Sequence, residues 1–326
     1  MTKRNDVLDI AKGLGIMLVV FGHLTYAKDP ERTLIHSFHM PMFMMLSGYL
    51  FKPRPVGSIV TRGTKNFLLA AYATLMIDIA ISFYTLADEK APLPTGGDWL
   101  ETFLLYDGLW RNLPVWYLFA LVICQAVSAV LLKGGPLLLA FTAAGATVFN
   151  LSLSTRIVWW PISTLFAFPF FALGVLFGQK ELAEPIQRRW KWLLAPSFAG
   201  LMYVAFFNGY TDMYSHIPGK SYLLFIVSGL LGTVFMIAFS TGLRRFGGIA
   251  ADFFCYLGKN TFLILITHYN ICRWLVPTLL DTFNKEWLAQ KFLFQASVTC
   301  LLIFLYCGFF LLLAARKQRA LSLAKP

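Results

Sequence analysis

Charged side chains are scarce in this sequence. They make up 13% of its 326 residues, against about a quarter in a typical soluble domain, while apolar residues reach 58% and the mean hydropathy is +0.65. Acidic residues are fewer than basic ones: the sequence has 16 Asp and Glu and 28 Lys and Arg, which gives a net charge of +12. These shortages exclude an ordinary soluble domain. They predict an all-α integral membrane protein with one transmembrane domain over residues 1–326.

Several motifs of well-known enzyme classes are also missing. The chain has no glycine-rich nucleotide-binding loop, no GxSxG nucleophile elbow and no HExxH zinc motif. Its five cysteines have no metal-ligand spacing and form no pair that indicates an external disulfide, so we interpret them as small apolar residues. The N-terminal histidines have no carboxylate or cysteine at local ligand spacing, so we expect no metal site.

Long apolar runs predict about ten membrane-spanning helices. They cover residues 7–26, 36–51, 66–86, 114–132, 136–153, 159–177, 192–208, 221–243, 257–276 and 292–315. Most lysines and arginines fall on the side that holds the N-terminus, so the positive-inside rule predicts that both termini are cytoplasmic. Basic loops beside anionic lipids explain the net charge without a nucleic-acid partner. We expect the membrane to be a bacterial inner membrane.

Two apolar segments near the N-terminus carry the residues from which we predict the function. The first, DIAKGLGIMLVVFGH, contains Lys12 and His23, which fall within about 20° of one helix face and about 16 Å apart along its axis. Asp9 lies one turn before Lys12 on that face and is expected to pair with it. The second segment, HSFHMPMFMMLSGY, opens with His36 and His39 after a short connection. We therefore expect these three histidines to lie close together near the outer surface.

A neutral imidazole in a partly dry site can accept the proton of a hydroxyl group near neutral pH. We interpret His23 as such a general base and His39 as its helper. Simpler interpretations stay open. The side chain of Lys12 can extend to the membrane–water interface, and His39 can form a hydrogen bond with the helix backbone. Asp78 and His268 are further ionisable residues within predicted spans and need partners there, although a buried histidine often makes a purely structural hydrogen bond between helices.

These two segments resemble the acyltransferase 3 family of membrane acyltransferases, and most closely its branch similar to fucose 4-O-acetylases. That family has a basic residue, ten intervening residues and a histidine in its first helix. Most members have arginine where this chain has Lys12, which keeps the charge but loses the two-pronged guanidinium group. Weaker similarity extends to PVWYLFAL, residues 114–121, and to LGKNTFLILITHYNI, residues 257–271. The resemblance implies an O-acetyltransferase that uses acetyl-CoA, with His23 as its essential histidine.

The resemblance also implies a route for the donor, whose pantetheine would pass Lys12 and present the thioester near His23. The residues expected around the donor are Lys12, Ser47, Arg62, Lys65, Lys259, Asn260 and Thr261, the last two at a helix start that could hold a phosphate. Those expected to bind the acceptor or support the site are His36, Asp78, Trp116, Arg156 and His268. Ordinary explanations stay open for many of them, such as positive-inside cations, close helix packing at Ser47 and an interfacial aromatic belt that includes Trp116.

We therefore predict a membrane O-acyltransferase for polysaccharide modification. It would move an acetyl group from cytoplasmic acetyl-CoA to a hydroxyl group of a cell-surface or exported carbohydrate, or of a lipid-linked sugar. The alternative hypothesis is a proton-coupled secondary transporter or flippase that uses His23, Lys12 and Asp78. A non-catalytic membrane sensor is a third hypothesis.

Overall fold

The computed structural model describes residues 5–24, 30–69, 76, 114–152, 160–272, 276–277, 280 and 291–323. Across these ranges the regular secondary structure is helical, and one isolated antiparallel bridge joins Asp212 and Ile217. The all-α prediction is therefore confirmed for the described residues.

The helices described are α1 (Asp6–Leu24), α2 (Pro30–Tyr49), α3 (Val56–Gly63) with a π-helical turn (Thr64–Leu68), α6 (Trp116–Leu131) with a 3-10 turn (Leu132–Gly134), α7 (Pro136–Ser152), α8 (Trp160–Gln179), α9 (Ala183–Arg188), α10 (Trp190–Asn208), α11 (Tyr222–Phe246), α12 (Gly248–Lys259), α13 (Thr261–Asn270) and α15 (Phe292–Leu323).

Four of these helical stretches are long and apolar enough to cross a membrane: Asp6–Leu24, Trp116–Gly134, Ile162–Gln179 and Tyr222–Phe246. The pair α12 and α13 would be a fifth span if its two halves count as one. The count of ten spans and the orientation of the termini stay predictions, and most of the predicted span 66–86 lies outside the described residues.

The helix start predicted at Asn260 and Thr261 is confirmed, and it directly follows a second helix. α12 ends at Lys259 and α13 begins at Thr261, and the two helices are bent by 77°. Asn260 sits at the bend with φ −118° and ψ 18°, and its side-chain amide donates to the carbonyl of Tyr256 at 2.8 Å. An asparagine side chain that bonds the backbone competes with helix continuation, which explains the break.

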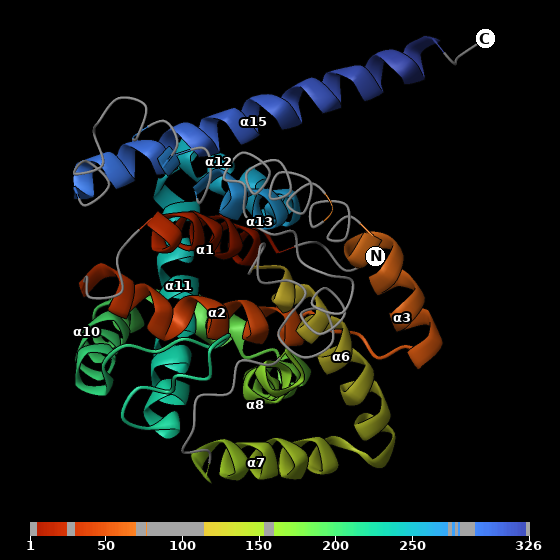
Figure 1. Cartoon of the computed structure of the whole chain (residues 1–326), viewed down its shortest axis with the longest axis vertical. Helices are drawn as coiled ribbons and strands as arrows, with labels where there is room; N and C mark the ends of the chain where they lie inside the picture. The colour runs from red at the N-terminus through yellow and green to blue at the C-terminus, as the bar shows by residue number, and fades with distance from the viewer. Residues whose placement is uncertain are drawn as a thin grey trace, which may run out of the picture.

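α1 and α2 lie side by side in the middle of the molecule (Figure 1). α12, α13 and α15 lie against α1, while α8 packs against α2 and α7 packs on the far side of α8. α11 passes behind both central helices, and α6 contacts α8 and α3. The two segments that carry the predicted functional residues are therefore enclosed by other helices.

Close contacts between backbones hold α1 against α12. A side-chain carbon added at Gly13 would overlap the carbonyl oxygen of Phe254, and one added at Gly258 would overlap the carbonyl oxygen of Asp9. Small residues at such positions let membrane helices approach closely and gain van der Waals contact. This packing fixes α1 in place beside α12 and α13.

α2 is held against α8 in the same way. Carbons added at Gly48 and Gly174 would overlap the carbonyl oxygens of Phe171 and Met45, respectively. The glycine at 48 therefore serves close helix packing, as the sequence allowed. α1 and α2, here called the N-terminal hairpin, are thus both packed closely against neighbouring helices. A precisely positioned site requires such support.

Candidate active site

Four histidines gather where the C-terminal end of α1 meets α2 and α13. The ring centroids of His23 and His268 are 5.2 Å apart, and those of His36 and His39 are 5.0 Å apart. His23, His36 and His39 line one cavity of about 270 Å³, here called the outer cavity. The expectation that the three N-terminal histidines lie close together is therefore confirmed.

Backbone hydrogen bonds fix the ring orientation of two of these histidines. Nδ1 of His39 lies 2.7 Å from the carbonyl oxygen of Ile35, and Nδ1 of His268 lies 2.8 Å from that of Ile264. Because a carbonyl oxygen only accepts, Nδ1 carries the hydrogen and donates in both cases. In the neutral ring Nε2 then holds the lone pair, so His39 keeps a proton acceptor available beside its structural bond.

Two residues of opposite charge that were not predicted from the sequence, Arg32 and Asp212, also line the outer cavity. The Arg32 guanidinium carbon lies 5.6 Å from the ring centroid of Tyr210. Arg32 precedes His36 by four residues, so both occupy the same face of α2, and that spacing was the signal available in the sequence.

Asp212 lines the outer cavity and stabilises the loop between α10 and α11 from within. Its carboxylate accepts hydrogen bonds from the backbone N–H of Tyr214 at 3.0 Å and from the hydroxyl of Ser215 at 3.1 Å. Burial, followed by the negative charge of Asp212, raises the pKa of the Tyr210 phenol to about 12. Tyr210 therefore stays a neutral hydrogen-bond donor at physiological pH.

Lys12 lies at the opposite end of α1 from His23. Its Nζ is 2.6 Å from a carboxylate oxygen of Asp9, with side-chain exposures of 20% and 4%, so the predicted ion pair is confirmed. Lys12 borders two cavities, one of about 640 Å³, here called the large cavity, and one of about 170 Å³, here called the middle cavity.

The middle cavity is narrow and mostly apolar. Ser47 and Tyr117 face it and share a hydrogen bond of 2.8 Å between their hydroxyl groups. Thr261 and Phe262, at the start of α13, line its wall, and the ring of Phe262 lies 5.4 Å from that of Phe67. Ser47 and Thr261, both expected near the donor, line the same cavity as Lys12.

The three cavities follow one another along α1. Lys12 borders both the large and the middle cavity, while Met40 and Leu265 border both the middle and the outer cavity. The series therefore runs from Lys12 past the Met40–Leu265 boundary to His23. Along the axis of α1 this is about 16 Å.

The large cavity carries charges of both signs. Lys12 and Lys52 line it together with Asp9, Glu181 and Glu184. Its mouth is therefore not a purely basic surface.

The structure brings only some of the predicted site residues to these cavities. Trp116 lines the outer cavity, whereas Asn260 shapes the bend before α13. Arg62, Lys65 and Lys259 are exposed, and none of them is among the described residues that line the three cavities. Asp78 and Arg156 lie outside the described residues.

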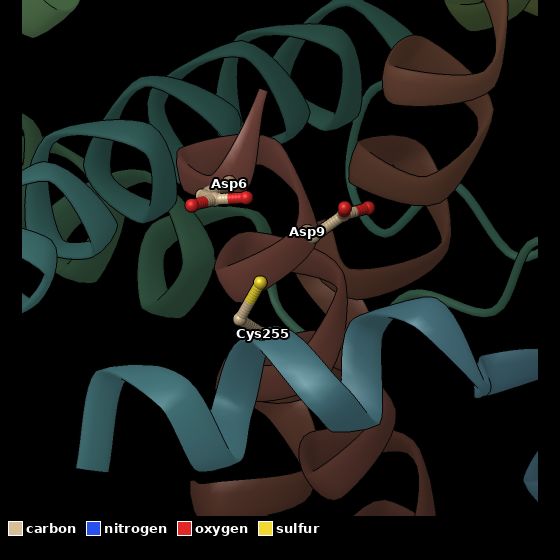
Figure 2. A group of neighbouring side chains, drawn as sticks. All are labelled: Asp6, Asp9 and Cys255. Atoms are coloured by element: carbon tan, nitrogen blue, oxygen red, sulfur yellow. The ribbon is translucent and has the colours of Figure 1, made fainter. Parts of the chain in front are cut away.

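A group of metal-ligand types lies near the start of α1, with Asp6 and Asp9 from α1 and Cys255 from α12 (Figure 2). Their ligand atoms lie within 4.8 Å of one another. However, Asp6 pairs with Arg244 at 3.1 Å, and Asp9 pairs with Lys12. Because both carboxylates already face cations, we assign no metal to this group.

Comparisons with known proteins identify the family of this chain. The family model described as Acyltransferase domain, of the acyltransferase 3 family, matches residues 5–315. The chain is similar to the nodulation protein NolL of Mesorhizobium japonicum, at 24% identity over 247 residues, which cover 66% of this chain and 59% of that protein. It is also similar to the nodulation protein NolL of Sinorhizobium fredii, at 26% identity over 235 residues, which cover 65% and 60%.

The chain thus aligns with about 60% of the length of these curated relatives. No solved structure matches it. The family match extends over both helices of the N-terminal hairpin and over α13, and the apolar helices fit a protein embedded in a membrane. The chain belongs to the acyltransferase 3 family.

Proposed function

We propose that this protein is an O-acetyltransferase that transfers an acetyl group from cytoplasmic acetyl-CoA to a hydroxyl group of a carbohydrate. The acceptor would be a cell-surface or exported polysaccharide, or a lipid-linked sugar, at the outer face of a bacterial inner membrane. The observation that carries the proposal is the series of cavities along α1, from Lys12 at one end to His23 at the other.

The sizes of the cavities suit the parts of such a donor. The large cavity, about 640 Å³, lies within the usual range of small-molecule sites and has room for a bulky group. The middle cavity, about 170 Å³, is too small for a nucleotide and suits a linear chain such as pantetheine. Lys12, between the two, provides a positive charge for the donor, while Ser47 and Thr261 contact the chain.

The outer cavity suits the reaction itself. His23 takes the proton of the acceptor hydroxyl while the hydroxyl oxygen attacks the thioester carbonyl carbon. The carbon–sulfur bond then breaks, the acetyl ester forms, and the coenzyme A thiolate receives the proton from His23. Nε2 of His39 accepts a hydrogen bond that orients the hydroxyl group, and the ring of Trp116 offers a flat apolar surface to a sugar.

The same cavity series gives reason to test a second function, a proton-coupled secondary transporter or flippase. In that case His23 and Lys12 would carry protons or contact a substrate in transit. The two functions differ in one simple respect. An acetyltransferase cleaves the thioester of acetyl-CoA in detergent, where no gradient exists, whereas a transporter does not.

The test uses detergent-purified wild type, His23→Ala, Lys12→Ala and, as the matched control, the exposed Lys133→Ala. Acetyl-CoA binding is measured by calorimetry, and thioester turnover by release of the free thiol. We expect His23→Ala to bind the donor with at least about 10²-fold lower turnover, since general-base catalysis contributes 10²–10⁴-fold. Lys12→Ala should bind the donor more weakly, and Lys133→Ala should behave as wild type.

Two results would overturn the proposal. A folded wild type that does not bind acetyl-CoA would exclude it as the donor. A His23→Ala variant with wild-type turnover would exclude His23 as the base.

A further inference from the structure

We infer that His268 is a positioning residue for His23: its Nε2 accepts a hydrogen bond from the imidazolium that His23 becomes when it takes the proton of the acceptor hydroxyl. This inference rests on the proposed acetyl transfer and goes beyond it, because it gives a specific role to a residue outside the lining of the outer cavity.

The position of His268 is the first observation. Its ring lies 5.2 Å from that of His23, at an interplanar angle of 44°. His23 lines the outer cavity, whereas His268 is not among the described residues that line it. The neighbouring Tyr269 does line the cavity, and its ring contacts His23 edge-on at 5.1 Å. His268 therefore acts on His23 rather than on a substrate in the cavity.

The hydrogen bonding of His268 is the second observation. Nδ1 donates to the carbonyl oxygen of Ile264 at 2.8 Å, so the lone pair of the neutral ring is on Nε2. His268 is completely buried, and no described residue donates a hydrogen bond to Nε2. Buried polar atoms nearly always have a partner, and an exception requires an explanation.

The reaction strengthens a hydrogen bond that His23 can donate to this atom. Neutral His23 has one N–H group and one lone pair, and the lone pair takes the proton from the acceptor hydroxyl. The opposite ring nitrogen keeps its N–H group, which is available to Nε2 of His268 and becomes a charged donor in the imidazolium. When His23 gives a proton to the coenzyme A sulfur, it returns to the neutral form and this hydrogen bond weakens.

The arrangement has a kinetic consequence. A hydrogen bond to an ionised group is stronger than one between neutral groups, so His268 stabilises His23 mainly while the ring is charged. Interactions that are stronger in the transition state than in the ground state raise kcat rather than lower KM. Removal of the Nε2 lone pair should therefore reduce kcat and leave donor binding intact.

The experiment compares three variants of the full-length purified protein. His268→Leu removes the acceptor, His268→Gln replaces it with an amide oxygen, and Thr267→Val is the control on the same helix. The Thr267 hydroxyl donates to the carbonyl oxygen of Leu263 and shares a hydrogen bond with the Tyr306 hydroxyl, so Thr267→Val removes hydrogen bonds of the same helix that do not involve His23. Should His268→Leu not elute as a monodisperse peak, His268→Met takes its place as a flexible apolar residue.

We expect His268→Leu to lower kcat for thioester cleavage on the order of 10²-fold, as removal of one preorganised hydrogen-bond group does in other active sites. The dissociation constant of acetyl-CoA should be unchanged, and Thr267→Val should keep the wild-type kcat. His268→Gln should recover a large part of the lost rate. In the His23→Ala background, His268→Leu should cause no further loss, because residues that act as a unit are not additive.

Other outcomes would overturn the inference. These are a wild-type kcat in His268→Leu, an equal loss in His268→Gln and His268→Leu, or a further loss in the His23→Ala background. If the wild type is active, none of these outcomes contradicts the proposed acetyl transfer. A wild type that binds acetyl-CoA without cleaving it would overturn the proposed function and this inference together.

Discussion

The ion pair between Lys12 and Asp9 allows one prediction that separates stability from donor binding. Lys12→Met removes the cation and leaves the Asp9 carboxylate, whose side chain is 4% exposed, without its partner at 2.6 Å. Removal of one partner of a buried pair costs about 3–5 kcal/mol when the remaining charge has no other compensation. Because Asp9 has a further interaction beside this ion pair and Lys12 is 20% exposed, we expect the lower end of that range.

A second substitution identifies the cause of this loss. Asp9→Leu in the Lys12→Met background also removes the buried carboxylate, and replacement of a buried pair by apolar residues is often nearly neutral. The double variant should therefore regain most of the lost stability. It should not regain acetyl-CoA binding, because the positive charge between the large and the middle cavity is still missing.

The assay measures unfolding free energies in detergent by chemical denaturation and donor binding by calorimetry, with Lys133→Met as the exposed control. The reasoning is refuted if Lys12→Met is as stable as Lys133→Met, since the ion pair would then not stabilise the fold. It is equally refuted if the double variant binds acetyl-CoA as wild type does, since the donor would then not need the charge of Lys12.

Three further predictions concern other parts of the structure. Met40→Trp should block the boundary between the middle and outer cavities and abolish thioester turnover, whereas Met76→Trp at an exposed position should not; turnover in both would contradict the route. Gly174→Leu should overlap the backbone at Met45 and lower stability by about 1–3 kcal/mol, and an unchanged unfolding midpoint would contradict this packing. The raised pKa of Tyr210 stabilises the fold below pH 10, and this contribution is lost as the pH rises towards about 12. Wild type should therefore lose more stability than Tyr210→Phe across that interval, as measured by thermal unfolding, and equal losses would argue against a buried phenol.

The parts of the site that follow helix periodicity could be predicted from the sequence. The spacing of Lys12 and His23 is fixed by the geometry of one helix, and the pairing of Asp9 with Lys12 is a contact within one turn. The closeness of His23 to His36 and His39 followed from the short connection between two apolar segments.

Contacts between distant segments could not be predicted in the same way. Asp212 reaches the outer cavity through a loop whose position depends on the packing of α10 and α11, and no local pattern reports that packing. The helix start at Asn260 and Thr261 was predicted, whereas the 77° bend to the preceding helix was not, because a sequence pattern does not report the angle between consecutive helices. Arg62 and Lys259 were expected near the donor, and both are exposed, so their role in donor binding stays a prediction. A cation that binds a phosphate and one on a cytoplasmic loop look alike in a sequence.

The most direct test of the central claim is the release of free thiol from acetyl-CoA by purified wild type and His23→Ala in detergent, without any gradient. We predict steady release by the wild type and a loss of at least about 10²-fold in His23→Ala, with acetyl-CoA still bound by both proteins. A folded wild type that binds acetyl-CoA and releases no thiol would contradict the account and favour transport through the same cavities.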